Sequence, residues 1–460
     1  MNSVPTPSRS ERFSARAPLA AIGIRLRQLH LFGPVSAQVH MAQKQVKHTP
    51  IPKLSEAFIA ILAGAHGLVA INKRLRADPS LHAAFGRQAC AEQSVVQETL
   101  DAWTEPNVAQ MHQAMDLIYR RHARGYGHDD TRSLQLWDAD MTGMPCGKKA
   151  AFASTGYFAK PRNRRGRQLG RVLATRYDAV VVDRLFAGTT QLTTALHPLV
   201  LAAEKTLELD DETRRRTLWR LDAGGGRVEA VNWLLGRGSP VHGQDDSGTR
   251  AQNLAAQVTA GVDDPRIPER HVGGVRGGAT PYSHPSRRVA VRGRKRNGQW
   301  GVGVLLSTLT PPEVIALTRQ PVERVNDPTA VLLASVYFYD QRGGGVETAI
   351  KGDKPGVGMT KRHKKRVAAQ QMLTQLHALA HNTIVWVRPW LTPDVPTLRR
   401  WGIMRLVRDV LHVNGRLTFA HGHGVSHIML NAADPRATRL VTALCAWLES
   451  DHLAVTLGKT

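Results

Sequence analysis

The spacing of apolar residues changes from helical to strand-like after Asp130, and this change restricts the fold more than any other feature of the sequence. Apolar, β-branched segments follow it, then a helical segment, then a further strand that leads through three glycines into another helix. Strands that lead into helices in this way predict an α/β sheet. The expected strands are Leu134–Asp140, Gly170–Tyr177, Ala179–Phe186 and Arg216–Asp222, and the expected helices are Pro198–Leu209 and Val228–Leu235.

Shifts in composition divide the rest of the chain. Residues 1–52 are basic and punctuated by Pro and Ser, which predicts a disordered arm, and 53–130 have the spacing of an all-helical domain. Residues 131–235 are the first part of an α/β core, and 236–330 read as a basic, β-containing insertion. The core resumes over 331–391 with a strand at Val331–Tyr339 and a long amphipathic helix, and 392–460 form a C-terminal region with a hairpin at Leu417–Leu430.

The charge of the chain restricts its partners. Lys and Arg number 62 and Asp and Glu 37, which gives a net charge of +25. Such a surplus calls for a polyanion, and nucleic-acid phosphate is the commonest one, although a generic basic protein would have the same composition. No apolar run is long enough to suggest a membrane span. The scattered Cys90, Cys146 and Cys445 predict neither a disulfide framework nor a zinc site, and they fit a cytoplasmic location.

Carboxylates stand at three places where chemistry is expected. Asp138 and Asp140 come at the end of an expected strand, where residues two apart share a face. Asp222 ends a later strand, and Glu347 follows three glycines near a long helix. Each acid has an ordinary explanation as well. Asp138 and Asp140 could be turn-forming residues at a strand end, and Asp222 could cap the helix that follows it. Glu347 could form solvated pairs with Lys351 and Lys354, which follow it by four and seven residues.

The order of the three acidic segments carries more information than any one of them. Phosphodiester chemistry needs oxygen ligands for magnesium, and two metal ions about 3.5–4 Å apart can activate a nucleophile and stabilise the leaving oxygen. A central sheet can bring together carboxylates that are far apart in the sequence. The sequence therefore predicts that Asp140, Asp222 and Glu347 converge on a metal site, with Asp138 as the alternative for the first position and Asp340 or Asp353 for the third.

At this point the sequence resembles the DDE transposases of bacterial insertion sequences, in the branch whose ribonuclease-H-like core is interrupted by a β-rich insertion. The segments Asp138–Thr142 and Arg220–Gly224 resemble the first- and second-aspartate strands, and Tyr339–Lys354 resembles the Tyr–Arg–Glu–Lys signature. The resemblance spans about residues 85–391. It implies a ribonuclease-H-like mixed sheet with flanking helices, in which Asp140, Asp222 and Glu347 bind the metal. It also implies that Tyr339, Arg342 and Lys354 contact or position DNA.

The signature departs from the family pattern at one place. Four residues separate Arg342 from Glu347, one more than is usual in the family, and the glycines 343–345 hold the extra residue. Pro355 should also shorten a helix that begins at Glu347. Either the loop bulges and Glu347 still reaches the site, or this copy has lost cleavage and only binds DNA.

The resemblance implies a cut-and-paste reaction at the ends of an insertion sequence, with Mg²⁺ as cofactor and Mn²⁺ as a substitute. The expected partners are double-stranded DNA, as terminal inverted repeats and target, and a second copy of the chain in the DNA complex; the expected location is the bacterial nucleoid. A nuclease on the same core is the rival. The insertion should bind phosphate through the basic run Arg292, Arg294, Lys295 and Arg296. The cluster His421, His423 and His427 lies in a glycine-containing turn without a matching ligand set, so a metal site there is disfavoured.

Overall fold

The computed structural model of the chain describes residues 10–43, 48–156, 158, 164–275, 280–294, 297–361, 363–420, 424–448 and 453–459. The chain divides into two units. The first contains residues 1–123, 145–153 and 349–460, and the second contains 124–144 and 154–348. The second unit therefore contains all three of the acids that the sequence selects, Asp140, Asp222 and Glu347.

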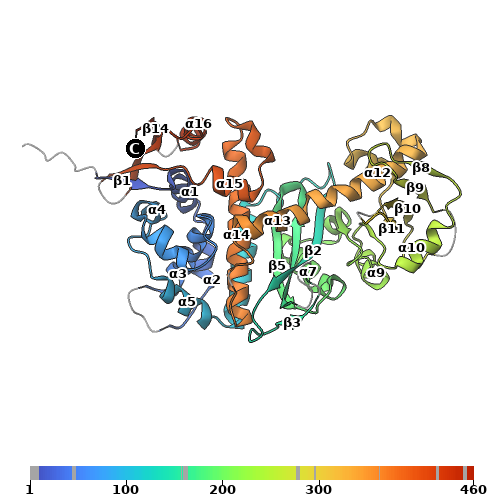
Figure 1. Cartoon of the computed structure of the whole chain (residues 1–460), viewed down its shortest axis with the longest axis horizontal. Coiled ribbons are helices and arrows are strands. Elements are labelled where there is room, and N and C mark those ends of the chain that lie inside the picture. Colours follow the sequence, from blue (N-terminus) through green and yellow to red (C-terminus); the bar gives the residue numbers. More distant parts are fainter. Residues whose placement is uncertain are drawn as a thin grey trace, which may run out of the picture. The chain divides into compact units, whose positions relative to one another are not determined.

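A ten-stranded mixed sheet forms the second unit, and the strand order is β3-β4-β2-β6-β7-β11-β10-β9-β8 with β5 paired to β4 (Figure 1). Strands β2, β6 and β7 are parallel, whereas β4 and β5 are antiparallel to each other, as are β7 and β11. The strands are β2 (Gln135–Pro145), β3 (Ser154–Thr155), β4 (Arg165–Ala174), β5 (Ala179–Ala187), β6 (Thr217–Leu221), β7 (Val241–Gln244), β8 (Gly261–Asp263), β9 (His271–Gly274), β10 (Arg287–Arg294) and β11 (Trp300–Ser307). The expected mixed α/β architecture is confirmed.

Helices connect the parallel strands and cover the sheet. Helix α7 packs against β4 and β5, and α9 packs against β7. Together with α7 (Leu192–Leu207) and α9 (Val228–Gly236), the unit has α8 (Asp211–Arg215), α10 (Gly248–Ala255), α11 (Pro311–Leu317) and α12 (Pro328–Asp340). Helix α7 begins six residues before the expected start at Pro198, which lies inside the helix.

The strands of the predicted insertion continue the core sheet. β7 pairs in parallel with β6, and β11 pairs antiparallel with β7, so residues 241–307 extend the same sheet outward. Within this region β10 and β11 form an antiparallel pair.

The strand predicted at Val331–Tyr339 is wrong, because this segment is the helix α12. Asp327 caps the helix by accepting hydrogen bonds from the backbone N–H groups of Thr329 and Ala330, and Pro328 occupies its first turn. The helix is buried on opposite sides, since Phe338 packs with Val314 and Ile315 while Val336 packs with strand residues. A helix that is apolar on all sides has no helical period in its sequence, so it resembles a buried strand.

The first unit is mainly helical. Its N-terminal half has β1 (Ser10–Ser14), α1 (Ala17–Gln28), α2 (Gly33–Gln38), α3 (Pro50–Leu62), α4 (Pro79–Ala84), α5 (Gln93–Ala102) and α6 (Glu105–His122). The expected disordered arm is therefore wrong for residues 10–38. The apolar residues of α1 are buried, and Arg25 and Arg27 lie in its last turn, where positive charge favours a helix.

The C-terminal part of this unit contributes a second sheet, in the order β1-β12-β13-β14. The hairpin expected at Leu417–Leu430 is confirmed as β12 (Gly415–Phe419) and β13 (Val425–Asn431). The other elements are α13 (Val346–Gly356), α14 (Val367–Leu391), α15 (Ile403–Asp409), α16 (Ala437–Leu448) and β14 (Ala454–Gly458). None of the helices that the structure describes is both long and apolar enough to cross a membrane.

Candidate functional site

The register between β2 and β6 aligns the first two candidate acids. Asp138 pairs with Arg220 in the parallel ladder, and Asp140 and Asp222 each follow two residues later. The ladder ends at the pair of Asp138 and Arg220, and both Asp140 and Asp222 interact electrostatically with Arg342. Strand β2 continues to Pro145, so the expected strand end at Asp140 is wrong; Asp140 lies inside β2, two residues after the ladder to β6 ends.

Asp138 is part of a buried ion pair. Its Oδ1 and Oδ2 accept hydrogen bonds from Nε and Nη2 of Arg220 at 2.7 and 2.9 Å. The side chains of the two residues are 0% and 1% exposed, and Nη1 of Arg220 also donates to the Phe338 carbonyl. Although Asp138 and Asp140 share a strand face, both oxygens of Asp138 are thus engaged, which disfavours Asp138 as the alternative for the first position.

Arg342 brings Asp140 and Glu347 together. Its Nη1 donates to Oε1 of Glu347 at 3.0 Å, and its Nη2 donates to the Ala139 carbonyl at 2.8 Å and lies 3.8 Å from Oδ2 of Asp140. The Arg342 residue is only 3% exposed, whereas the Glu347 side chain is 56% exposed. The guanidinium therefore links the third acid to the strand that carries the first.

Burial favours the protonated form of Asp140. It raises the pKa of this carboxyl, the Arg342 guanidinium opposes the rise, and the negative charges of Asp222 and Glu347 add to it, so that the pKa is about 6. Asp222 also interacts electrostatically with Arg342. The three acids thus lie within electrostatic range of one another.

A tight turn fixes the position of Asp222 directly after β6. The Gly225 N–H group donates to both the Asp222 carbonyl and its Oδ1, at 3.0 and 3.2 Å. A Cβ atom on Gly226 would lie 1.8 Å from the Gln244 carbonyl oxygen, so only glycine fits where this turn passes β7. The three glycines therefore serve the close packing of the turn.

Tyr339 lies at the end of α12 and faces the same region. Its hydroxyl donates to Oε1 of Gln244 at 2.9 Å, in the residue that ends β7. Burial raises the pKa of Tyr339 to about 12, so the hydroxyl stays protonated at neutral pH. Tyr339 can therefore act as a hydrogen-bond donor.

The segment before Glu347 accommodates the extra residue. Gln341–Gly344 form one tight helical turn, and α13 then begins at Val346, so that Glu347 lies in its first turn. A Cβ atom on Gly345 would lie 2.4 Å from Oδ2 of Asp138 and 2.9 Å from Cγ2 of Thr175. Helix α13 ends at Gly356, one residue after Pro355, in agreement with the expectation that this proline keeps the helix short.

Gly345→Ala should lower the free energy of unfolding by about 1–3 kcal/mol, because the new methyl group overlaps a carboxylate that Arg220 holds in place. Gly344→Ala is the matched control: a Cβ atom there has no heavy atom within 4 Å, so its effect should stay within about 0.5 kcal/mol. Urea denaturation of both variants measures the difference. Equal effects of the two substitutions would show that the close approach at Gly345 is not tight.

Two of the candidate acids have other roles in the structure. Asp340, on α12, pairs with Nη2 of Arg270 at 2.8 Å, and Arg270 also binds Asp264. Asp353 is fully buried in the first unit, where it lies 2.8 Å from Nδ1 of His381. Lys351 and Lys354 belong to the part of α13 in the first unit, with Lys351 exposed and Lys354 half-buried. The third acid that the structure brings to Asp140 is therefore Glu347.

Of the basic run proposed to bind phosphate, Arg292 and Arg294 lie on β10, and Lys295 and Arg296 fall outside the described residues. The guanidiniums of Arg292 and Arg294 lie 4.7 and 5.7 Å from the centre of the Trp300 ring. Arg294 also pairs with Glu269 at 3.1 Å, an acid that the local sequence did not reveal. His421 and His423 likewise lie outside the described residues, while His427 on β13 bonds to Thr456.

Sequence reasoning missed the residues that support the acids. Arg220 and Gln244 hold Asp138 and Tyr339 in place, respectively. Arg220 gave a usable signal, because an arginine within the apolar strand Leu218–Leu221 must find a buried partner. Gln244 gave none. In the part of the chain that the structure describes, no three His, Cys, Asp or Glu side chains are grouped closely enough to form a preformed metal site.

Comparison with solved structures shows a likeness to a transposase. The chain is similar to the cryo-EM structure of a piggyBac transposase in a synaptic complex with hairpin DNA. The match covers 94% of this chain and 82% of the transposase chain, with 12% sequence identity and a TM-score of 0.44. No protein-family model matches the sequence, and no curated protein matches it.

Proposed function

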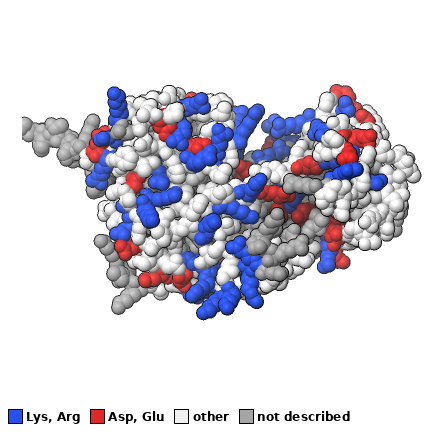
Figure 2. Space-filling view, viewed as in Figure 1, with Lys and Arg blue, Asp and Glu red and all other residues white. Residues whose placement is uncertain are grey.

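We propose that this chain is a DDE transposase that cuts DNA strands and joins the cut ends to new DNA. The observation that carries the proposal is that Asp140 and Asp222 each follow two residues after the paired Asp138 and Arg220, together with the contacts of Arg342 with Asp140 and Glu347. The net charge of +25 supports a nucleic-acid partner, and Figure 2 shows Lys and Arg side chains spread over much of the visible face. The mixed sheet with flanking helices is the architecture expected of a ribonuclease-H-like core.

The donor set fits a divalent cation of the magnesium type, because all three candidate ligands are carboxylates. The pKa of Asp140 supports this fit, since Asp222 and Glu347 both raise it and therefore share its electrostatic surroundings. Asp140, Asp222 and Glu347 would hold Mg²⁺, or Mn²⁺ in its place. When bound, the metal would supply positive charge that activates the attacking oxygen and stabilises the leaving oxygen.

The groups around the acids have positioning roles in this proposal. Arg342 is buried and committed to Ala139, Asp140 and Glu347, which supports a role in positioning the third acid over one in contacting DNA. Tyr339 orients Gln244 beside the Asp222 strand. Lys351 and Lys354 would meet the DNA backbone, in a complex of two copies of the chain on the ends of a bacterial insertion sequence.

A strand-transfer assay tests the proposal. The substrate is a labelled duplex that contains the DNA flanking the gene, with a supercoiled plasmid as target and Mg²⁺ or EDTA as the variable. Nicking at the element end and joining of that end to the plasmid, both abolished by EDTA, is the expected result. Cleavage without joining would identify a nuclease on the same core. Binding without cleavage in Mg²⁺ and Mn²⁺ would identify a copy that only binds DNA.

Arg292→Gln/Arg294→Gln should weaken DNA binding alike for all sequences and make it less dependent on salt. Each lost phosphate contact reduces the slope of log K against log[salt] by about 1, so the slope should fall by up to about 2. The pairing of Arg294 with Glu269 makes Arg292 the larger contributor. Gel shifts across a range of salt concentrations measure the slope.

The matched control is Arg215→Gln/Arg324→Gln, which removes the same charge from two exposed arginines of the same unit. Its slope should stay close to that of the unmodified protein. If both double variants change the slope equally, only net charge is at work, and β10 has no specific role in binding DNA.

A further inference from the structure

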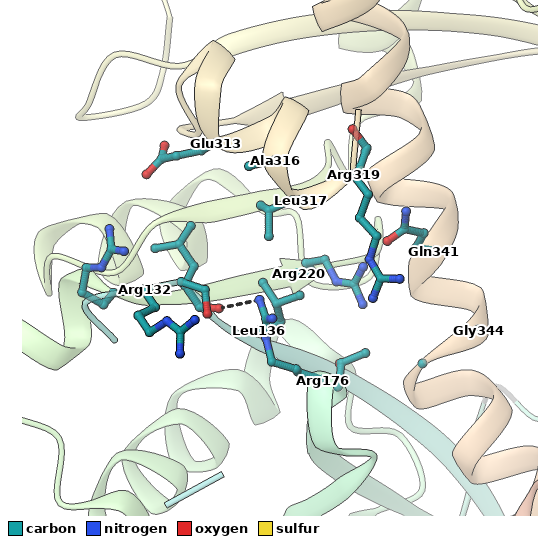
Figure 3. A pocket seen from close by; sticks show the side chains of 16 residues that line it. Arg132, Leu136, Arg176, Arg220, Glu313, Ala316, Leu317, Arg319, Gln341 and Gly344 are labelled. Carbon is teal, nitrogen blue, oxygen red and sulfur yellow. Dashed lines mark hydrogen bonds between the residues drawn. The ribbon is translucent and has the colours of Figure 1, made fainter. Parts of the chain in front are cut away.

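A basic pocket of about 860 Å³ lies in the second unit, where strands β2 and β6 begin (Figure 3). Its walls come from the start of both strands, from the turn after β4, from α11 and the segment after it, and from the glycine segment before Glu347. Asp140, Asp222 and Glu347 are not among the described residues that line it. The pocket is therefore separate from the three acids.

Positive charge dominates the lining. Arg132, Arg176, Arg216 and Arg319 contribute to the walls, with the buried Arg220 at the back and Glu313 as the acid among the described lining residues. Oε2 of Glu313 already accepts hydrogen bonds at 2.8 Å from the backbone N–H and the hydroxyl of Thr310, in the capping box of α11. The acid is thus committed to its own helix.

The four wall arginines have few internal partners. Arg176 and Arg216 donate to the backbone carbonyls of Leu134 and Asp130, and Arg132 and Arg319 are exposed. Within the described ranges, none of the four forms an ion pair within 4.0 Å. Glu313 is the one acid among the described lining residues, so the positive charges gathered in the pocket repel each other unless an anion lies between them.

Arg319 occupies a backbone position that usually belongs to glycine. Helix α11 ends in a Schellman motif, in which the Arg319 N–H donates to the Ala316 carbonyl at 3.0 Å and the Gln320 N–H to the Ile315 carbonyl at 3.1 Å. Arg319 has a φ of 56°, in the left-handed region that disfavours residues with a Cβ atom. Its side chain reaches into the pocket towards Arg220 in Figure 3. The residue with the strained backbone is therefore one whose side chain lines the pocket.

We propose that this pocket binds the phosphates of a nucleotide, with Arg176 and Arg319 as principal contacts. Guanidinium groups bind phosphate through paired, charge-assisted hydrogen bonds, which is the chemistry that the four wall arginines offer. Leu134, Leu136 and Leu317 give the pocket apolar surface against which a sugar or base can lie. A free nucleotide and a nucleotide of a DNA strand present the same chemistry, and the experiment separates them.

The test is isothermal titration calorimetry in EDTA, which prevents cleavage and so leaves the result independent of the proposed function. The probes are dATP and single-stranded hexathymidylate. Arg176→Gln/Arg319→Gln should weaken binding of a probe at least tenfold, while Arg215→Gln/Arg324→Gln, with the same net charge and outside the lining, should leave it within twofold. Pocket-dependent binding of hexathymidylate assigns the site to a DNA strand, and pocket-dependent binding of dATP alone assigns it to a free nucleotide.

Arg319→Gly provides a second variant that separates binding from folding. It relieves the left-handed strain and removes the charge, so Tm should rise or stay constant while binding of the probe falls. The proposal is overturned if neither probe binds at millimolar concentration, if both double variants weaken binding equally, or if Arg319→Gly leaves binding unchanged.

Discussion

Asp138→Ala should lower the free energy of unfolding by about 3–5 kcal/mol, because it leaves the Arg220 guanidinium buried without its charge partner. The variant removes the two hydrogen bonds from Arg220 to the carboxylate. Of the hydrogen bonds of Arg220 described above, the one to the Phe338 carbonyl remains. Arg220 is only 1% exposed, so its charge is left largely desolvated when the carboxylate is removed. Urea denaturation of the metal-free protein measures the effect.

Two further variants separate charge burial from other causes. Asp211→Ala removes a carboxylate that is 77% exposed and pairs with Arg214 on the surface, so its effect should stay below about 1 kcal/mol. Asp138→Leu/Arg220→Met replaces the pair by apolar groups and should recover much of the lost stability. A metal-free Asp138→Ala protein as stable as the parent would contradict the structural role and restore Asp138 as a candidate metal ligand.

Asp222→Asn should abolish strand cleavage in Mg²⁺ and leave DNA binding nearly unchanged. The amide oxygen can still accept the hydrogen bond from the Gly225 N–H, so the turn after β6 is preserved while the charge is lost. An amide holds magnesium poorly, and the loss should exceed the roughly 10- to 100-fold that follows removal of a group that only supports a metal ligand. Binding is retained because phosphate contacts are spread over many Lys and Arg residues.

Asp222→Asn should also change the pKa of Asp140 in the metal-free protein. Removal of the neighbouring negative charge lowers the pKa of Asp140 from its raised position. Asp246→Asn, on the loop after β7, is the matched control and should cleave at the parental rate. Nicking by Asp222→Asn at the parental rate would exclude Asp222 as a metal ligand. If the parent protein binds DNA but never nicks it, the extra residue before Glu347 is the first candidate for the loss of cleavage.

The sequence located strands β2, β4, β5 and β6 by their apolar runs, although β4 begins at Arg165 and ends at Ala174, each earlier than expected. It failed at α12, where a helix buried on all sides has no polar face to reveal its period. It failed again at residues 10–38, where the apolar residues of α1 outweigh the basic ones. Composition averages over such a segment, whereas burial depends on which face each residue takes.

For the candidate site, the sequence could select acids but not their partners. Asp138 and Asp140 are equivalent by pattern, and only the register with β6 shows that Arg220 engages the first and leaves the second beside Asp222. The role of Arg342 followed from resemblance, while its contacts with Ala139 and Asp140 join residues about two hundred positions apart. No local pattern contains that information.

The three acids differ in what determines their position, and this decides which insertions the site can tolerate. The position of Asp140 depends on the register of β2 with β6, so one residue added to β2 before Asp138 would turn both of its acids to the opposite face. The salt bridge with Arg342 positions Glu347. The loop between these two residues can therefore vary in length as long as the salt bridge is kept. Length differences among related chains should therefore accumulate before the third acid and be absent from the strands that carry the first two.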